Sequence, residues 1–460
     1  MRTVIASKLN VFVTAGVAAI LVLIPFHAFL AVWAASLLGH YTAFRLWKEF
    51  LLIPLFIAGV YLLCTNRVLW REAKNSWLLR VMAAYVLLQF GLGAIAYMRH
   101  EVNAAALAEG IIEDTRLMVF FCIAWIAAAG SPWLRHHWRQ SVLIPAAVVV
   151  AFGLLQAFVL PANFLSHFGY SSATIKPYEL VDQNSQFVRV QSTLRGANPL
   201  GAYLVIISAA LIGLAQAKLR AGKVKTKQFA ILSILGIALL VTLYVTYSRS
   251  AYIGTALAIC GIGWLSIGDE RMKRWLLVAV AVVCVFVGSA MLLLRHNTTF
   301  EDTFFHTSQL SHSQHSSNQN RTTALENGVH DVMHEPLGHG PGSAGPASVH
   351  NNHPARIAEN YFLQVGQETG WLGLGLFIAI NLLVAKALWR RRSEHDPLAI
   401  VLLVSLAGIT VINMLSHAWA DDTLAYVWWG LAGITLAPIM QTKAEQVHGR
   451  QKKPASKPAS

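Results

Sequence analysis

Long unbroken apolar runs constrain this chain more than any other feature of its sequence. Hydrophobic residues make up 55% of the 460 positions and charged residues 13%, and the apolar residues gather in runs rather than at amphipathic spacing. A helix of about 20 apolar residues crosses a bilayer core of about 30 Å, in which lipid offers no partner to an unpaired backbone amide. The sequence therefore predicts an all-α integral membrane protein and not a soluble globular enzyme. About twelve transmembrane helices are predicted, at 11–36, 49–65, 76–97, 117–134, 141–160, 199–217, 229–247, 251–267, 275–294, 361–385, 397–416 and 423–440.

The basic residues are distributed unevenly about these spans. A formal net charge of +14 would by itself suit a protein that binds nucleic acid. Of the 36 lysines and arginines, however, 24 fall on one side of the predicted membrane and 11 on the other, with Arg80 inside a span. An excess of lysine and arginine marks the cytoplasmic side. Both termini are therefore predicted to be cytoplasmic, and the charge requires no nucleic-acid partner.

Most of the chain outside the membrane is predicted on the opposite, exterior side. Loops as long as 161–198 and 296–360 are uncommon unless they have a role of their own, and the second is predicted to join spans nine and ten. The predicted organisation is helices one to five at 1–160, an exterior loop at 161–198, helices six to nine at 199–295, the large exterior loop at 296–360, helices ten to twelve at 361–440 and a disordered basic tail at 441–460.

Three exterior arginines lie beside the ends of predicted spans: Arg189, Arg195 and Arg249. Arg249 occupies a connection of about three residues, which holds its guanidinium at the membrane boundary. A guanidinium is always charged, and its paired planar donors suit phosphate oxygens. Any one of these arginines could instead interact with lipid headgroups. The three together favour an anionic, lipid-linked substrate.

Histidines are concentrated in the large loop, which holds nine of the 18. His330 and His334 have the i, i+4 spacing that two zinc ligands on one helix face require. The glutamate of an HExxH motif and a third ligand are missing from that pattern, so no metal and no cofactor are predicted. His339 differs from the other loop histidines because Gly338 and Gly340 flank it and allow the backbone to approach another group closely.

The start of the tenth span carries ionisable and amide side chains. Glu359 and Asn360 lie at its boundary, and Glu368 lies about two turns further along. An ionisable residue at that depth is costly unless it is paired or faces a wet cavity. Glu368 could therefore hold helices together by pairing with an arginine, or it could have a direct part in chemistry.

In this combination the chain resembles the bacterial O-antigen ligases, within the larger family that includes O-antigen polymerases and protein O-oligosaccharyltransferases. The resemblance covers roughly 185–375. It rests on four elements in order: Arg195-Gly196 with Asn198-Pro199, Ser248-Arg249-Ser250, Arg321 followed by Pro336 and Gly338–Gly342, and Asn360-Tyr361-Phe362-Leu363 followed by Glu368, Gly370 and Gly373.

The resemblance implies a glycosyltransferase in the bacterial inner membrane whose active site faces the periplasm. Such an enzyme transfers a glycan from undecaprenyl diphosphate to the core oligosaccharide of lipid A, without a metal and with inversion at the anomeric carbon. The resemblance assigns the diphosphate to the arginines and supporting roles to three further side chains. The diphosphate-binding arginines are Arg189, Arg195, Arg249 and Arg321, and the supporting side chains are Asn198, Asn360 and Glu368.

The catalytic base is the point at which this chain departs from its relatives. Many relatives have His-Asn before the aromatic-Leu pair, whereas this chain has Glu359-Asn360. The base is therefore expected to be His339, with the carboxylate of Glu359 as the alternative. Histidine suits the role because its pKa lies near neutral pH.

Two other functions remain open from the sequence. An O-antigen polymerase would use the same donor and similar arginines, and the product, a longer glycan still on the carrier, would distinguish it. A transporter or flippase with about twelve helices would more often show broken helices in paired halves and charges near the bilayer midplane. The charged candidates here gather at the exterior boundary, beside a long loop.

Overall fold

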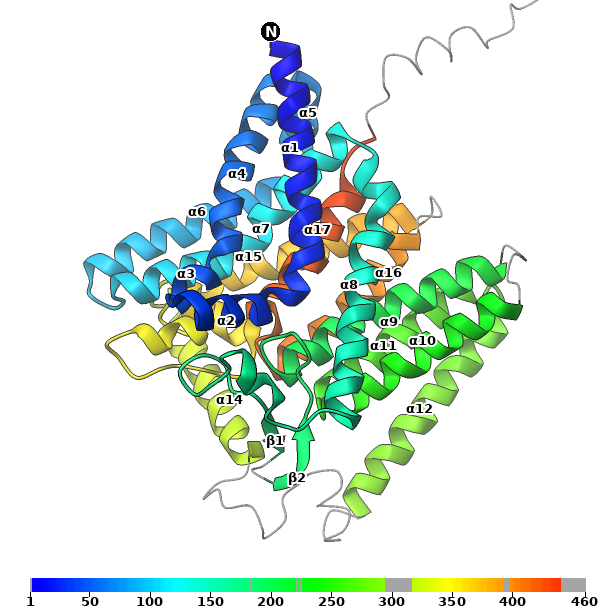
Figure 1. Ribbon diagram of the computed structural model, residues 1–460. Coiled ribbons are helices and arrows are strands. Elements are labelled where there is room, and N and C mark those ends of the chain that lie inside the picture. The colour runs from blue at the N-terminus through cyan, green and yellow to red at the C-terminus, as the bar shows by residue number, and fades with distance from the viewer. Residues whose placement is uncertain are drawn as a thin grey trace, which may run out of the picture.

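The computed structural model describes residues 2–181, 184–220, 222, 226–293, 317–392 and 397–439. The predicted tail at 441–460 and part of the large loop, 294–316, lie outside these residues. Within them, the secondary structure is helical apart from one short hairpin (Figure 1). The hairpin and α14 lie at the end of the molecule opposite α5 and the N-terminus (Figure 1).

The first half of the chain is a series of helices. They are α1 (Arg2–Leu23), the 3-10 turn η1 (Ile24–Phe26), α2 (His27–Leu38), α3 (Tyr41–Arg45), α4 (Trp47–Thr65), α5 (Arg67–Asn75), α6 (Trp77–Met98), α7 (Ala104–Gly130) and α8 (Trp133–Phe158). Pro25 lies in η1, and because proline lacks a backbone N–H it interrupts the predicted first span at that turn. The Asn66 side chain caps α5 by accepting from the backbone amides of Val68 and Leu69.

The second half begins with the segment that follows α8 and continues with the remaining helices. The elements are η2 (Phe164–Phe168), β1 (Glu179–Val181), β2 (Asn184–Arg189), α9 (Ala197–Arg220), α10 (Thr226–Tyr244), α11 (Arg249–Ser266), α12 (Glu270–Leu293), α14 (Ser317–His334), η4 (Pro346–His350), α15 (Tyr361–Arg392), α16 (Pro397–Leu415), η5 (Ala418–Ala420) and α17 (Asp422–Leu436). The strands β1 and β2 pair antiparallel with Glu179 opposite Arg189. This hairpin was not predicted.

Eight stretches of the described residues are long and apolar enough to cross a membrane, and each coincides with a predicted span. They are Val4–Leu38, α4, α6, α8, α9, α10, α15 and α16. Helices also occupy the other predicted spans, as α7, α11, α12 and α17. These four are not among the stretches that are long and apolar enough to cross a membrane; α17, for example, has 15 residues. The helical, membrane-spanning character agrees with the prediction, whereas the number of about twelve spans is not confirmed.

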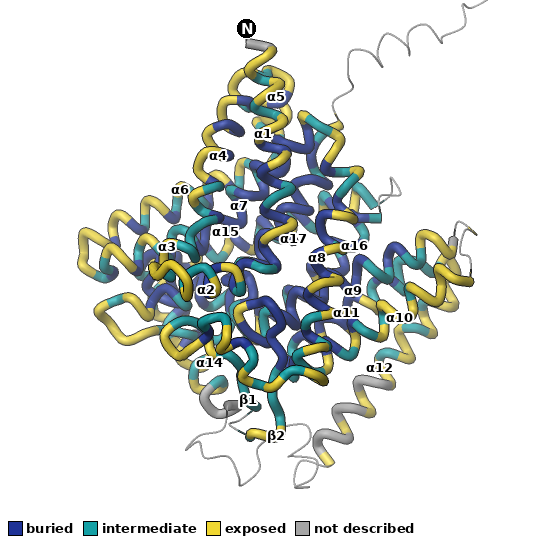
Figure 2. Tube along the Cα trace, viewed as in Figure 1, coloured by how far each residue is buried: buried dark blue, intermediate teal, exposed yellow. Residues whose placement is uncertain are grey.

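The core is built by helices that approach closely at glycines. α17 packs against α7, and α16 packs against both α9 and α11. A Cβ atom added to Gly408 on α16 would overlap the carbonyl oxygen of Gly254 on α11, and one added to Gly433 on α17 would overlap that of Phe121 on α7. Small residues permit such approach between membrane helices. Figure 2 shows α7 and α17 largely buried at the centre, whereas α10 exposes much of its length.

The long helix α15 is interrupted in its N-terminal third. Gly370 has φ 63° and ψ −164°, which is not helical. The segment that follows α14 fills the break: Trp371 N donates to Pro336 O at 3.0 Å, His339 N to Gln367 O at 3.0 Å and Gly340 N to Glu368 O at 2.7 Å. Irregular backbone at membrane depth is tolerated where protein groups satisfy it in this way.

Candidate functional site

A cavity of about 250 Å³ lies where the hairpin, the start of α9, the start of α14 and both ends of the α16–α17 connection meet. We refer to it as the arginine cavity. Its lining combines two guanidinium groups, three carboxylates and one imidazole. These are Arg195, Arg321, Glu179, Glu359, Asp421 and His417.

Arg195 reaches the arginine cavity from the turn between β2 and α9. Its Nε atom lies 3.8 Å from Oδ2 of Asp421, and 48% of its side chain is exposed. Asp421 is at the same time the N-cap of α17 and accepts from Leu424 N at 3.2 Å. Because the carboxylate is shared with the helix end and the contact is long, Arg195 retains donors for another partner.

Arg189 does not line the cavity itself but holds Asn198, which does. Its three nitrogens contact Asn198 Oδ1 at 2.6 Å, Thr246 O at 3.0 Å and Glu179 Oε2 at 3.3 Å. Burial lowers the pKa of Arg189, as do the nearby guanidinium groups of Arg321 and Arg249, while Glu179 opposes them. Asn198 therefore lines the cavity in an orientation that Arg189 fixes.

The opposite wall is formed by Arg321 and Glu359. Arg321 Nη2 lies 3.9 Å from Glu359 Oε2, and 39% of the arginine side chain is exposed. Glu359 has φ 51°, a left-handed backbone conformation that residues other than glycine seldom adopt. Such conformations persist where the surroundings enforce them and are common at functional sites.

The residues after Glu359 explain what enforces this conformation. Asn360 accepts from Leu363 N at 3.1 Å and donates to Met414 O at 3.0 Å. Tyr361 N donates to Ser416 O at 3.3 Å. These contacts cap α15 and fasten its start to the α16–α17 connection. They bring Glu359 and His417 to one cavity.

His417 is the imidazole of the arginine cavity. Burial lowers its pKa, as do the Arg195 and Arg321 guanidinium groups, while the Glu359 carboxylate raises it. The net direction is downward, which favours the neutral ring at neutral pH. Its Nδ1 atom is buried and makes no hydrogen bond within the part of the chain that the structure describes. A neutral imidazole beside two guanidinium groups is able to accept a proton.

Three of the predicted residues lie elsewhere. Arg249 opens α11 and is exposed, and it does not line the arginine cavity, although its charge reaches Arg189. Glu368 is buried in α15 and accepts from Gly342 N at 2.8 Å. His339 is held between two carboxylates, with Nδ1 3.1 Å from Glu101 Oε2 and Nε2 3.1 Å from Glu335 Oε2. The ring thus lies between two carboxylates outside the arginine cavity.

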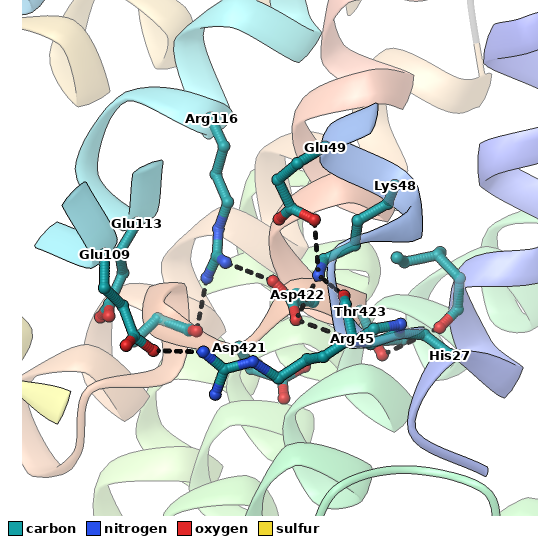
Figure 3. Close-up of polar contacts among 12 residues, drawn as sticks. His27, Arg45, Lys48, Glu49, Glu109, Glu113, Arg116, Asp421, Asp422 and Thr423 are labelled. Carbon is teal, nitrogen blue, oxygen red and sulfur yellow. Dashed lines mark hydrogen bonds and ion pairs between the residues drawn. The ribbon is translucent and has the colours of Figure 1, made fainter. Parts of the chain in front are cut away.

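A buried cluster of charges fixes the start of α17, next to Asp421 (Figure 3). Asp422 contacts Lys48 Nζ at 3.2 Å and His27 Nε2 at 3.3 Å, and it also pairs with Arg116. The Lys48 side chain is only 2% exposed and contacts Glu49 at 3.1 Å as well. Charges at this depth are tolerated when they are paired. The cluster joins α2, α4 and α7 to the α17 terminus that carries Asp421.

Sequence reasoning missed His417, Asp421 and Glu179. The sequence did carry a signal for His417 and Asp421, because the connection between the last two predicted spans is short and contains ionisable residues. The same argument, a short connection at a helix end, selected Arg249. Glu179 had no such signal, because only the pairing of β1 with β2 places it opposite Arg189.

The arrangement suits a particular kind of chemistry. Two incompletely paired guanidinium groups can bind a multiply charged anion and stabilise negative charge that develops on it. A carboxylate and a neutral imidazole in the same cavity can accept a proton. Transfer of a group from a phosphate-type leaving group to a hydroxyl requires both functions.

Part of the chain is similar in sequence to a known protein family. Residues 233–378 match the family model described as O-antigen ligase. The matched segment runs from α10 into α15 and contains Arg249, Arg321 and Glu359, whereas Arg195 and His417 lie outside it. Comparison with curated proteins gives no match. Over residues 233–378 the chain is therefore similar to the O-antigen ligase family, and the apolar helices described above fit a membrane protein of that kind.

Proposed function

We propose that this protein is an O-antigen ligase that transfers a glycan from undecaprenyl diphosphate to the core oligosaccharide of lipid A on the periplasmic side of the inner membrane. The observation that carries the proposal is the arginine cavity, in which Arg195 and Arg321 face Glu359 and His417. The family match supports the lipid-linked glycan as substrate class.

The diphosphate of the donor binds to Arg195 and Arg321 in this proposal. Each has one carboxylate contact longer than 3.5 Å, so each keeps donors for phosphate oxygens. Arg189 holds Asn198 in place, and Arg249 adds positive charge at the exterior end of α11. Asn360 fixes the backbone of Glu359, and Glu368 fixes the loop through Gly342.

The reaction is a single displacement. The acceptor hydroxyl oxygen attacks the anomeric carbon, the bond from that carbon to the diphosphate oxygen breaks, and undecaprenyl diphosphate leaves with the electron pair. Attack from the opposite face inverts the anomeric centre. The guanidinium groups stabilise the charge on the leaving group, and no metal takes part in this step.

The proton of the acceptor hydroxyl passes to Glu359. This carboxylate lines the arginine cavity, whereas His339, the first candidate from the sequence, lies outside that cavity between the carboxylates of Glu101 and Glu335. The ring of His417 in the same cavity is neutral and adds no positive charge beside Glu359. If His417 were protonated, its charge would weaken Glu359 as a base.

The test is a reaction of the purified protein with undecaprenyl diphosphate-linked glycan and rough lipopolysaccharide in the presence of a chelator. Glycan on the lipid A core is the expected product. A longer glycan still on the carrier would make the protein a polymerase, and movement of the donor across a vesicle membrane without a new bond would make it a flippase. Arg271→Ala, at an exposed position on α12, is the matched control for arginine substitutions.

A further inference from the structure

A second cavity, of about 590 Å³, lies beside the arginine cavity at the exterior end of the molecule. Its walls are α14 and the segment 355–358, and Gln367 of α15 lies at its base. We refer to it as the α14 cleft. Its polar lining consists of Thr323, Asn327, Asp331, Arg356 and Gln367.

The polar groups of the α14 cleft are arranged in advance of any ligand. Gln367 is 2% exposed, and its Nε2 donates to Asp331 Oδ2 at 2.7 Å. Arg356 Nη2 contacts the same oxygen at 3.2 Å and Glu335 Oε1 at 2.7 Å. The Oε1 atom of Gln367 is buried and has no hydrogen-bond partner among the described residues. A buried acceptor left without a donor is costly, so this amide is suited to a ligand that supplies one.

The chemistry of the lining fits a sugar better than a phosphate or an acyl chain. The Arg356 guanidinium is already neutralised by Asp331 and Glu335, which leaves no excess positive charge for a phosphate. The remaining polar groups, Asn327 and Thr323, are neutral. Between them the lining includes the small and apolar residues Ala324, Gly328, Ile357 and Ala358. Saccharides present hydroxyl groups at their edges and C–H groups on their ring faces, and such a surface matches both.

The position of the α14 cleft relates it to the proposed reaction. Arg321 of the arginine cavity and Thr323 of the cleft lie on the same turn of α14, and Ala358 of the cleft precedes Glu359. Asn327 lies six residues beyond Arg321, or about 9 Å along a helix. A sugar ring at Asn327 is therefore one or two rings away from a bond that breaks at Arg321.

We propose that the α14 cleft is a saccharide-binding subsite that holds a sugar unit next to the reacting one. This inference rests on the proposed function for the identity of the saccharide, and it deepens that function by assigning a second site. The saccharide belongs either to the repeat unit of the donor or to the lipopolysaccharide core, and both share the chemistry described above.

Binding of free oligosaccharides to the purified full chain tests this proposal. The two probes are the core oligosaccharide of rough lipopolysaccharide and the oligosaccharide released from the lipid-linked donor, each titrated separately by isothermal calorimetry. Asn327→Ala removes an exposed lining residue, and Gln367→Met removes the buried amide with little change of volume. Each loses a hydrogen bond, so each is expected to weaken one saccharide about 3- to 10-fold.

The chain offers a matched control on the same turn. Glu326 is exposed and does not line the α14 cleft. Asn327→Trp should abolish saccharide binding by filling the cleft, whereas Glu326→Trp should leave it unchanged. If the Asn327 variants bind only the core oligosaccharide more weakly, the cleft is an acceptor subsite. If they bind only the oligosaccharide released from the donor more weakly, the cleft is a donor subsite.

The outcomes separate this proposal from the proposed function. If the wild type forms no glycan product but the Asn327 variants still weaken saccharide binding, the subsite proposal is supported and the transferase proposal fails. Arg271→Ala should bind both probes as the wild type does, because Arg271 lines neither cavity. The subsite is overturned if the wild type binds neither probe, or if Asn327→Trp binds both unchanged.

Discussion

The carboxylate of Glu359 lies 3.9 Å from the guanidinium of Arg321, and it is presented by a backbone in the left-handed conformation. An anion binder and a proton acceptor are thus adjacent, on segments that the sequence separates by most of the large loop. A substrate that bridges them would have its leaving group at Arg321 and its incoming hydroxyl at Glu359.

The first prediction concerns this carboxylate. Glu359→Gln removes the charge with little change of shape and should lower the rate of glycan transfer about 10²- to 10⁴-fold, the usual contribution of a general base. Donor binding should persist because Arg195 and Arg321 remain. His339→Ala provides the comparison and should retain most activity. Loss of transfer in His339→Ala with near-normal Glu359→Gln would return the base to the histidine.

The second prediction concerns pH. The pKa of His417 lies below its ordinary value of 6.5, so its ring is neutral at neutral pH and becomes charged only as the pH falls through that lowered pKa. Transfer should fall over the same acidic range. His417→Gln should lose this dependence and keep substantial activity at neutral pH. The rate profile of each variant between pH 5 and 8 is the measurement, and an unchanged profile in His417→Gln would contradict the proposed influence on Glu359.

The third prediction concerns the diphosphate. Arg195→Ala and Arg321→Ala should each lower transfer roughly 10- to 100-fold, because a hydrogen bond to a charged group contributes about 1.5–3 kcal/mol. Arg195→Lys should recover little, since an ammonium lacks the paired planar donors. Expression and thermal stability should match the wild type, as they should for Arg271→Ala. Wild-type transfer by Arg195→Ala would exclude this arginine from donor binding.

The fourth prediction concerns the buried charges around Asp422. Asp422→Ala leaves Lys48 and Arg116 without their shared carboxylate, and the loss of one member of a buried ion pair costs about 3–5 kcal/mol. The apparent Tm in detergent should fall markedly. Glu270→Gln removes one half of the Lys273 pair, in which the glutamate side chain is 72% exposed, and should change the Tm little. Similar Tm values for the two variants would mean that the cluster does not stabilise the fold.

The fifth prediction concerns topology. The asymmetry of basic residues places 218–228 in the cytoplasm and 296–360 in the periplasm. Alkaline phosphatase fused after His334 should be active, and the same reporter fused after Gly222 should be inactive. The reverse pattern would invert the orientation and place the arginine cavity on the cytoplasmic side.

The sequence was a good guide to the helices and a partial guide to the site. Apolar runs are a property of contiguous residues, so the helices at the predicted spans could be found one by one. Short connections pin their side chains at a helix end, which is why Arg249 was selected, and Arg195 was selected because it lies beside the start of a span. The same reasoning applied to the α16–α17 connection would have selected His417 and Asp421.

His339 shows what a local pattern cannot provide. Its flanking glycines predicted close backbone approach, and the approach is real: a Cβ added at Gly338 would lie 2.5 Å from Glu368 O. The glycines did not indicate which group would be approached. That depends on the break in α15 and on Glu101, which is more than 200 residues away in the sequence. The buried ion pairs of Asp422 were unpredictable for the same reason, since their partners come from α2, α4 and α7.

The break at Gly370 has a consequence for how this region can vary between relatives. In an uninterrupted helix, the carbonyls of Gln367 and Glu368 would accept from amides one turn later; here they accept from His339 and Gly340. Segment 335–342 therefore completes the hydrogen bonding of α15. Because the donors are backbone amides whose positions depend on the left-handed conformations of Gly338 and Gly340, a segment exchanged at 335–342 satisfies those carbonyls only if it keeps the same turns. Segment 335–342 and the start of α15 therefore form a single structural unit.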